Sequence, residues 1–173
     1  MEKNWYAIYT KSRAEKKTAE LLNYHNIEHY LPLQKKLKQW SDRKKWVEEP
    51  LIRSYIFVNI ANDKEYLKTL DTDGVVRFIT FEGKAARIPE NQIENIRLLL
   101  ASEEELEITT ENFEPGMDII VRAGTLKGLE GELIETRGKN RVQVQLQAIG
   151  QSILVEIPLV YLQRKEQLVG SEW

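Results

Sequence analysis

Hydrophobic residues dominate the stretch 50–60 and are continuous from Tyr55 to Val58. It is the most β-favouring run of the first hundred residues, because its centre is aromatic or β-branched. Successive residues of a strand face opposite sides, so Tyr55 and Phe57 share one face while Ile56 and Val58 share the other. The aliphatic face can pack under helices. The two rings are either core or a surface that a partner covers, because rings left in water are costly.

The periodicity around this strand predicts an α+β sandwich with a mainly antiparallel sheet. Ser12 followed by Glu15 has the spacing of a capping box, which predicts that a helix begins there. Asp63 is the predicted cap of a second helix, and Pro89 suits the start of a third. The other predicted elements are strands at 5–10, 27–33 and 75–81, and a hairpin over 34–49 that turns at Ser41–Asp42.

From Asp118 onward the pattern is purely that of a β protein. Short alternating runs are separated by glycine-containing turns, and the run 141–147 alternates strictly, which favours a strand over a helix. Five short strands of this kind predict a small barrel, an architecture that leaves no open sheet edge. The predicted strands lie at 119–121, 133–134, 141–147, 152–157 and 161–162.

Charge divides the chain into three parts. Residues 1–100 contain 18 Lys and Arg against 14 Asp and Glu, residues 101–117 contain six Glu and no basic residue, and residues 118–173 contain seven of each sign. A basic part, an acidic part and a neutral part indicate two domains with different partners. We therefore expect an α+β domain over 1–101, an acidic linker over 102–117 and a β-barrel over 118–173.

Composition excludes several classes of chemistry. The chain has no cysteine and two histidines, so we expect neither a disulfide framework nor a metal site. No nucleotide-binding, metalloprotease or nucleophile-elbow motif is present, which predicts a protein without a cofactor or enzymatic activity. No apolar run approaches the ~20 residues of a membrane span, and the first residues lack the apolar core of a signal peptide. We expect a cytoplasmic monomer with no membrane contact.

Basic residues gather at two places in the first part. One group lies at the start of the first predicted helix, where backbone amides also favour phosphate. The other lies in the predicted hairpin, interleaved with Trp40 and Trp46. Phosphate neutralisation beside stacking rings is typical of nucleic-acid binding, although a charge run can also be a solvated face. The predicted nucleic-acid-binding residues are Lys11, Arg13, Lys16, Lys17, Lys44 and Lys45.

The segment 118–133 contains the most specific motif of the chain. Gly124, Gly128 and Gly131 follow the first strand of the barrel, where we expect them to supply positive φ and sharp bends, and Lys127 precedes the second glycine. This order of strand, glycine, Lys-Gly and glycine resembles the KOW motif of NusG-type transcription factors and of some ribosomal proteins.

Residues 1–100 in turn resemble the N-terminal (NGN) domain of the NusG family. The hairpin segment 39–46 is most similar to the UpxY group, so within the family the chain most resembles the specialised UpxY/RfaH-type paralogues. Many members carry Phe-Pro-Gly or Phe-Pro-Asn where this chain has Ile52-Arg53-Ser54, a difference expected to alter the turn. The stretches that carry the resemblance are 5–9, 30–32, 50–58, 74–78 and 88–89.

The resemblance implies a transcription elongation factor that binds RNA polymerase through the clamp helices of its largest subunit. Such a factor favours the closed clamp, contacts the non-template DNA strand and suppresses pausing and termination, here of specific operons such as polysaccharide loci. With this family in view, a partner-helix groove becomes the favoured role of the aromatic face. The implied polymerase-binding residues are Trp5, Tyr9, Tyr55, Phe57, Tyr66 and Thr69.

The KOW barrel implies a second partner, such as a 30S ribosomal protein or the termination factor Rho. Because KOW barrels also occur in ribosomal proteins, a ribosome-associated RNA-binding protein is the alternative function. The acidic segment 101–117 and the pI of about 5.9 speak against that alternative.

Overall fold

The computed structural model describes residues 2–165 and divides into two compact units. Unit 1 comprises Met1–Leu100 and unit 2 comprises Ala101–Trp173. The division lies beside the predicted end of the first domain. The segment predicted as a linker, 102–117, belongs to unit 2.

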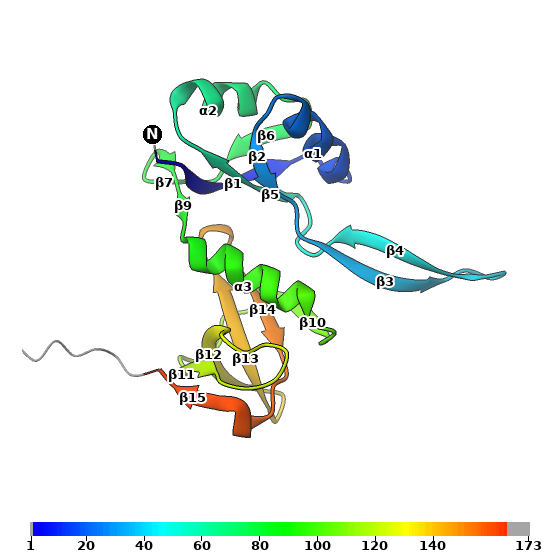
Figure 1. The fold of residues 1–173 in the computed structure, drawn as a ribbon, viewed down its shortest axis with the longest axis vertical. Helices are drawn as coiled ribbons and strands as arrows, with labels where there is room; N and C mark the ends of the chain where they lie inside the picture. Colours follow the sequence, from blue (N-terminus) through cyan, green and yellow to red (C-terminus); the bar gives the residue numbers. More distant parts are fainter. Residues whose placement is uncertain (1, 166–173) are drawn as a thin grey trace, which may run out of the picture. The chain divides into compact units, whose positions relative to one another are not determined.

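Unit 1 is an α+β sandwich, as predicted. Its main sheet is antiparallel with the order β2-β5-β1-β6, and β9 also pairs with β1. Figure 1 shows α1 and α2 on one side of this sheet and α3 on the other. The elements are β1 (Asn4–Thr10), α1 (Glu15–Tyr24), β2 (Glu28–Tyr30), β3 (Leu33–Gln39), β4 (Lys44–Pro50), β5 (Tyr55–Ile60), α2 (Asp63–Leu70), β6 (Val75–Phe78), β7 (Thr80–Phe81), β8 (Lys84–Ala85), β9 (Arg87–Ile88) and α3 (Glu90–Ala101).

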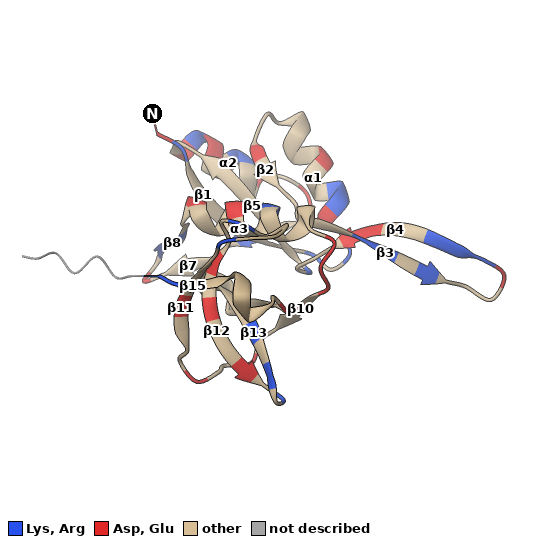
Figure 2. Ribbon diagram, turned by 60° about the horizontal axis from the view of Figure 1, so that its bottom comes forward, with Lys and Arg blue, Asp and Glu red and all other residues tan. Residues whose placement is uncertain are grey.

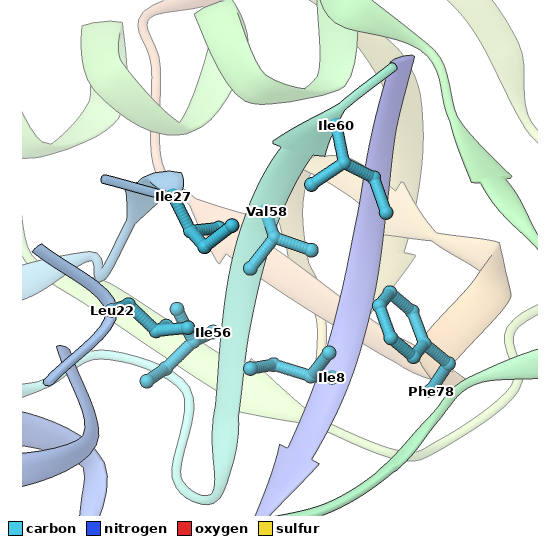
Figure 3. Packing of buried hydrophobic residues seen from close by; sticks show 7 residues of the cluster. All are labelled: Ile8, Leu22, Ile27, Ile56, Val58, Ile60 and Phe78. Atoms are coloured by element: carbon cyan, nitrogen blue, oxygen red, sulfur yellow. The ribbon is translucent and has the colours of Figure 1, made fainter. Parts of the chain in front are cut away.

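The core of unit 1 lies on the aliphatic face of β1 and β5. Ile8, Ile56 and Val58 are fully buried there, together with Leu22 of α1 (Figure 3). Phe78 of β6 closes the cluster. Burying each such side chain stabilises the fold by about 1.5–3 kcal/mol relative to exposure, so this cluster holds α1 and α2 against one face of the sheet. The prediction that the aliphatic face packs under helices is confirmed.

The predicted capping box at the first helix is wrong. A turn closed by the amide of Ala14 and the carbonyl of Lys11 (3.1 Å) comes first, and α1 begins only at Glu15, without a side-chain cap. The Glu15 carboxylate is buried and instead accepts a hydrogen bond from the amide of Ser54 (2.9 Å). Glu15 therefore joins α1 to the turn before β5. In α2, Asn62 rather than Asp63 is the cap, accepting from the amide of Glu65 (2.9 Å).

Unit 2 is an antiparallel β domain with the strand order β10-β14-β13-β12-β11-β15. The five predicted strands correspond to β11–β15, and the strictly alternating run 141–147 lies in β13 except for Gln147. Two short 3-10 turns interrupt the strands. The elements are β10 (Leu106–Thr109), β11 (Met117–Val121), β12 (Glu130–Thr136), β13 (Lys139–Leu146), η1 (Gln147–Ile149), β14 (Gln151–Val155), η2 (Leu159–Tyr161) and β15 (Leu162–Arg164).

Strand β10 lies inside the segment predicted as a linker. It pairs with β14 over the whole of its length, from Leu106 opposite Val155 to Thr109 opposite Ser152. Arg141 of β13, which is largely buried, forms an ion pair with Glu107 of β10. The acidic composition of the segment obscured the alternating run Leu106–Thr109. Its Glu107 is paired with Arg141, which lies two strands away in the sheet. The predicted linker is therefore partly a sixth strand.

Replacing Glu15 with alanine should lower the free energy of unfolding by about 1–3 kcal/mol, because the Ser54 amide loses its acceptor at a poorly hydrated site. Urea denaturation followed by circular dichroism measures this loss. Glu20→Ala removes an exposed carboxylate from the same helix and should change stability by less than about 0.5 kcal/mol. Equal stabilities of the two variants would show that this hydrogen bond does not hold α1 to the turn.

Candidate functional site

The face of the main sheet opposite the core carries aromatic side chains from β1 and β5. Trp5, Ala7 and Phe57 are buried, with exposed fractions of 7%, 0% and 1%. Tyr9 and Tyr55 at the far end of the same strands are half-buried, and their ring centroids lie 5.6 Å apart in an edge-to-face arrangement. The face therefore has a covered part and a part that solvent reaches.

The covered part is occupied from within unit 1. The guanidinium of Arg97, on α3, lies over the rings of Trp5 (5.9 Å) and Tyr30 (5.1 Å). Burial raises the pKa of Tyr30, and the opposing effect of the Arg97 charge is smaller. The Trp5 ring thus already has an intramolecular cation–π partner.

The solvent-exposed part is a patch of three side chains on three adjacent strands. Tyr9 of β1 is directly opposite Tyr55 of β5 on one side and Arg77 of β6 on the other. The Arg77 guanidinium lies 5.7 Å from the centre of the Tyr9 ring, and Arg77 is exposed. We call Tyr9, Tyr55 and Arg77 the tyrosine patch. Tyrosine and arginine are enriched among the residues that dominate binding energy at protein interfaces.

Four of the six predicted polymerase-binding residues lie in other surroundings. Phe57 and Trp5 belong to the covered part described above. Thr69 is fully buried and its hydroxyl donates to the carbonyl of Glu65 (2.8 Å), while the Tyr66 ring stacks on the core Phe78 ring at 4.3 Å. The structure therefore brings only Tyr9 and Tyr55 of that set together at a surface. Arg77 was not predicted as a site residue, because its place beside Tyr9 depends on the pairing of β1 with β6.

The basic residues predicted on the first helix are all exposed. The ammonium group of Lys16 donates to the backbone carbonyl of Glu48 in β4, which joins α1 to the base of the β3–β4 hairpin. Lys11 lies 3.8 Å from the Asp73 carboxylate, an exposed pair of little energetic weight. Glu15 occupies the first turn of α1, so the predicted attraction of phosphate by the helix amides is opposed by a carboxylate.

The β3–β4 hairpin forms as predicted and is a two-stranded sheet of its own. Figure 1 shows it extending away from the main sheet of unit 1, and Figure 2 shows Lys and Arg on both of its strands. Glu49 lies 3.4 Å from Lys36 and 3.0 Å from Lys38; the hydrogen bond from Lys38 is the main cause that lowers the pKa of Glu49. The predicted nucleic-acid-binding residues Lys44 and Lys45 are exposed on β4.

The glycine-rich loop of unit 2 agrees with the predicted KOW motif at two of its three glycines. Gly124 and Gly128 have φ of 84° and 96°, and the amide of Gly128 donates to the carbonyl of Val121 (2.8 Å). Gly131 does not have positive φ; a Cβ there would lie 2.7 Å from the side chain of Val142. The role predicted for Gly131 is therefore wrong, because β13 packs closely against it. Lys127 is exposed at the loop.

Within residues 2–165 no three His, Asp or Glu side chains gather where they could hold a metal ion. Over the same residues, no helix combines the length and the apolar character needed to cross a membrane.

Comparison with known proteins places these features in a family. The model of the family described as "Transcription termination factor nusG" matches residues 3–97, more than half of the chain. The transcription termination/antitermination protein NusG of Rickettsia conorii is 26% identical over 168 residues, which cover 90% of this chain and 86% of that protein. Its counterpart in Rickettsia felis is 25% identical over 171 residues, with the same coverage.

The fold is also similar to a solved structure of Thermotoga maritima NusG, described as showing domain interaction. The TM-score is 0.55 at 20% sequence identity, over 96% of this chain and 99% of that chain. An α+β unit followed by a β unit with a KOW-type glycine loop thus defines a two-domain protein of the NusG type. With the family match over residues 3–97, the chain belongs to the NusG family of transcription factors.

The turn before β5 forms here without a glycine or an asparagine at Ile52-Arg53-Ser54. Ser54 adopts the left-handed conformation, with φ of 65°, and its carbonyl accepts from the amide of Thr10 (2.9 Å). Ile52 is buried at 1% exposure and Arg53 is exposed. A serine in this conformation is tolerated because hydrogen bonds from Thr10 and to Glu15 fix both of its backbone groups.

The different surroundings of Gly128 and Gly131 predict that alanine and asparagine rank in opposite orders at the two positions. Gly128→Ala should cost about 1–2 kcal/mol through its left-handed backbone, and Gly128→Asn should cost less. Gly131→Ala should cost about 1–3 kcal/mol through overpacking against Val142, and Gly131→Asn should cost more. Thermal unfolding of the four variants measures whether alanine or asparagine is more destabilising at each position. The same ranking at both positions would contradict the assignment of backbone conformation to Gly128 and close packing to Gly131.

Proposed function

We propose that this protein is a transcription elongation factor that binds RNA polymerase in the cytoplasm, favours the closed clamp and suppresses pausing and termination. The observation that carries the proposal is the tyrosine patch on the main sheet of a NusG-family unit. It is the part of the aromatic face that unit 1 leaves accessible. Its proposed partner is the tip of the clamp helices of the largest polymerase subunit.

The geometry of the patch suits a helical partner. Tyr9 and Tyr55 are held by the antiparallel pairing of β1 with β5, so they lose little conformational entropy when a partner binds. Their rings supply apolar area for one face of an amphipathic helix. Arg77 at the edge of the patch supplies a guanidinium that can pair with a carboxylate or a backbone carbonyl of that helix.

Nucleic-acid contact is proposed for the basic side of unit 1. Arg13 and Lys17 are exposed on and beside α1, close in sequence to Lys11 and Lys16, and the hairpin adds Lys44 and Lys45. In the proposed complex these residues face the displaced non-template DNA strand and neutralise its phosphates.

Unit 2 is proposed to recruit a second partner, a 30S ribosomal protein or Rho, while unit 1 holds the polymerase. The resemblance of the hairpin segment to the UpxY group supports action on specific operons, such as polysaccharide loci. The protein would act as a monomer, because each unit offers its partner a separate surface.

Removing the Tyr55 ring should weaken polymerase binding at least about ten-fold, because a central interface tyrosine is replaced by a methyl group. Binding of the full chain to purified RNA polymerase, measured with fluorescence anisotropy, gives the dissociation constants. Tyr24→Ala is the matched control, since it removes a ring that is 79% exposed on α1 of the same unit. Tyr24→Ala should bind like the wild type.

Circular dichroism should show that Tyr55→Ala keeps the fold, because Tyr55 lies outside the buried core cluster. A folded Tyr55→Ala variant with wild-type affinity would mean that the tyrosine patch does not dock on polymerase.

A further inference from the structure

The β3–β4 hairpin presents two chemically different faces. Leu37 and Trp46 are directly opposite each other across the two strands, so their side chains lie on one face. They are 50% and 65% exposed. We call this surface the tryptophan face; its residues, by the register of the strands, are Lys35, Leu37, Gln39, Lys44, Trp46 and Glu48.

The exposure of this pair is unusual for a large apolar side chain. Half or more of each side chain remains in water, and neither belongs to the core cluster of unit 1. A second ring, that of Trp40, is 43% exposed at the turn of the hairpin, with the guanidinium of Arg43 5.7 Å from its centre. The far half of the hairpin thus holds two accessible π surfaces.

The charges of the hairpin are divided between its faces. On the opposite face Lys36 and Lys38 both pair with Glu49. Among residues 2–165, no carboxylate lies within 4.0 Å of the ammonium groups of Lys35 or Lys44, although Glu48 is opposite Lys35 at the base of the tryptophan face. Unneutralised lysines therefore stand on both sides of the exposed Trp46 ring along the hairpin.

We propose that the tryptophan face is a base-stacking site for single-stranded DNA. The ring of Trp46 stacks on an unpaired base, and Lys44 and Lys35 neutralise the phosphates on either side of it. Trp40 and Arg43 place a second ring and a guanidinium at the turn, outside the tryptophan face. The choice of DNA rests on the proposed function, in which unit 1 lies beside the non-template strand; the hairpin then adds a stacking site to the phosphate contacts of α1.

A duplex would not use this surface in the same way. The π faces of paired bases are occupied by their neighbours, so a duplex offers the hairpin phosphates but no free base. The proposal therefore predicts a preference for unpaired DNA that depends on the ring at position 46, whereas charge alone would predict no such dependence.

The test uses the full chain and a fluorescein-labelled oligothymidine of about 12 nucleotides, within the usual site size for such proteins. Fluorescence anisotropy at several salt concentrations gives the dissociation constant and its salt dependence. Trp46→Leu keeps an apolar partner for Leu37 but removes the π surface. It should weaken binding about ten-fold at every salt concentration, with an unchanged slope of log affinity against log salt.

Lys44→Gln should instead change the salt dependence of binding. Removing one phosphate contact should lower the magnitude of the salt slope by about 0.7, the value for one contact with a single strand. Lys36→Gln is the matched control, because Lys36 lies on the opposite face and pairs with Glu49. It should leave the slope unchanged. Backbone chemical shifts of residues 33–50 verify that each variant keeps the hairpin.

Three results would overturn the proposal. They are wild-type affinity in a Trp46→Leu variant whose hairpin is intact, equal affinity of the wild type for a duplex of the same length, and at least ten-fold tighter binding of the matching RNA.

Polymerase binding is measured in parallel to separate this proposal from the one it rests on. Trp46→Leu should bind polymerase normally, and Tyr55→Ala should bind oligothymidine normally. Failure of polymerase binding alone overturns the proposed function only.

Discussion

The antiparallel pairing of β1 with β5 is the constraint on which unit 1 depends. Its register, from Asn4 opposite Ile60 to Tyr9 opposite Tyr55, decides which side chains enter the core and which meet solvent. A shift by one residue would exchange the two faces and place isoleucines where the tyrosine patch lies. Fold stability and the proposed docking surface are therefore set by the same hydrogen bonds, and the turn held by Glu15 helps to fix them.

Local patterns in the sequence predicted the elements well. The alternation around Ile56 and Val58 correctly identified the core face, and the turn at Ser41–Asp42 correctly identified the hairpin. Helix starts and strands that depend on distant contacts were missed. The capping box failed because the Glu15 carboxylate is used by Ser54, 39 residues away, and β10 was missed because its partner strand is more than 40 residues downstream.

The candidate site could be predicted only in part, for the same reason. Residue type marked Tyr9, Tyr55 and Phe57 as aromatic neighbours but could not rank their exposure, which depends on the packing of the whole unit. Gly131 shows the same limit in unit 2, where its need for a small side chain comes from β13 rather than from its own backbone. Sequence patterns identify chemistry, and tertiary packing decides which of that chemistry is accessible.

The hairpin also has a consequence for the solubility of the protein. As a two-stranded sheet, it leaves the outer edges of both β3 and β4 without a neighbouring strand among residues 2–165. Such edges can pair with another copy of the chain and begin aggregation, and lysines are a common protection because like charges repel the approaching strand. Lysines occupy both strands here. Salt that screens these lysines would weaken the protection of the edges and the proposed attraction of DNA phosphates together.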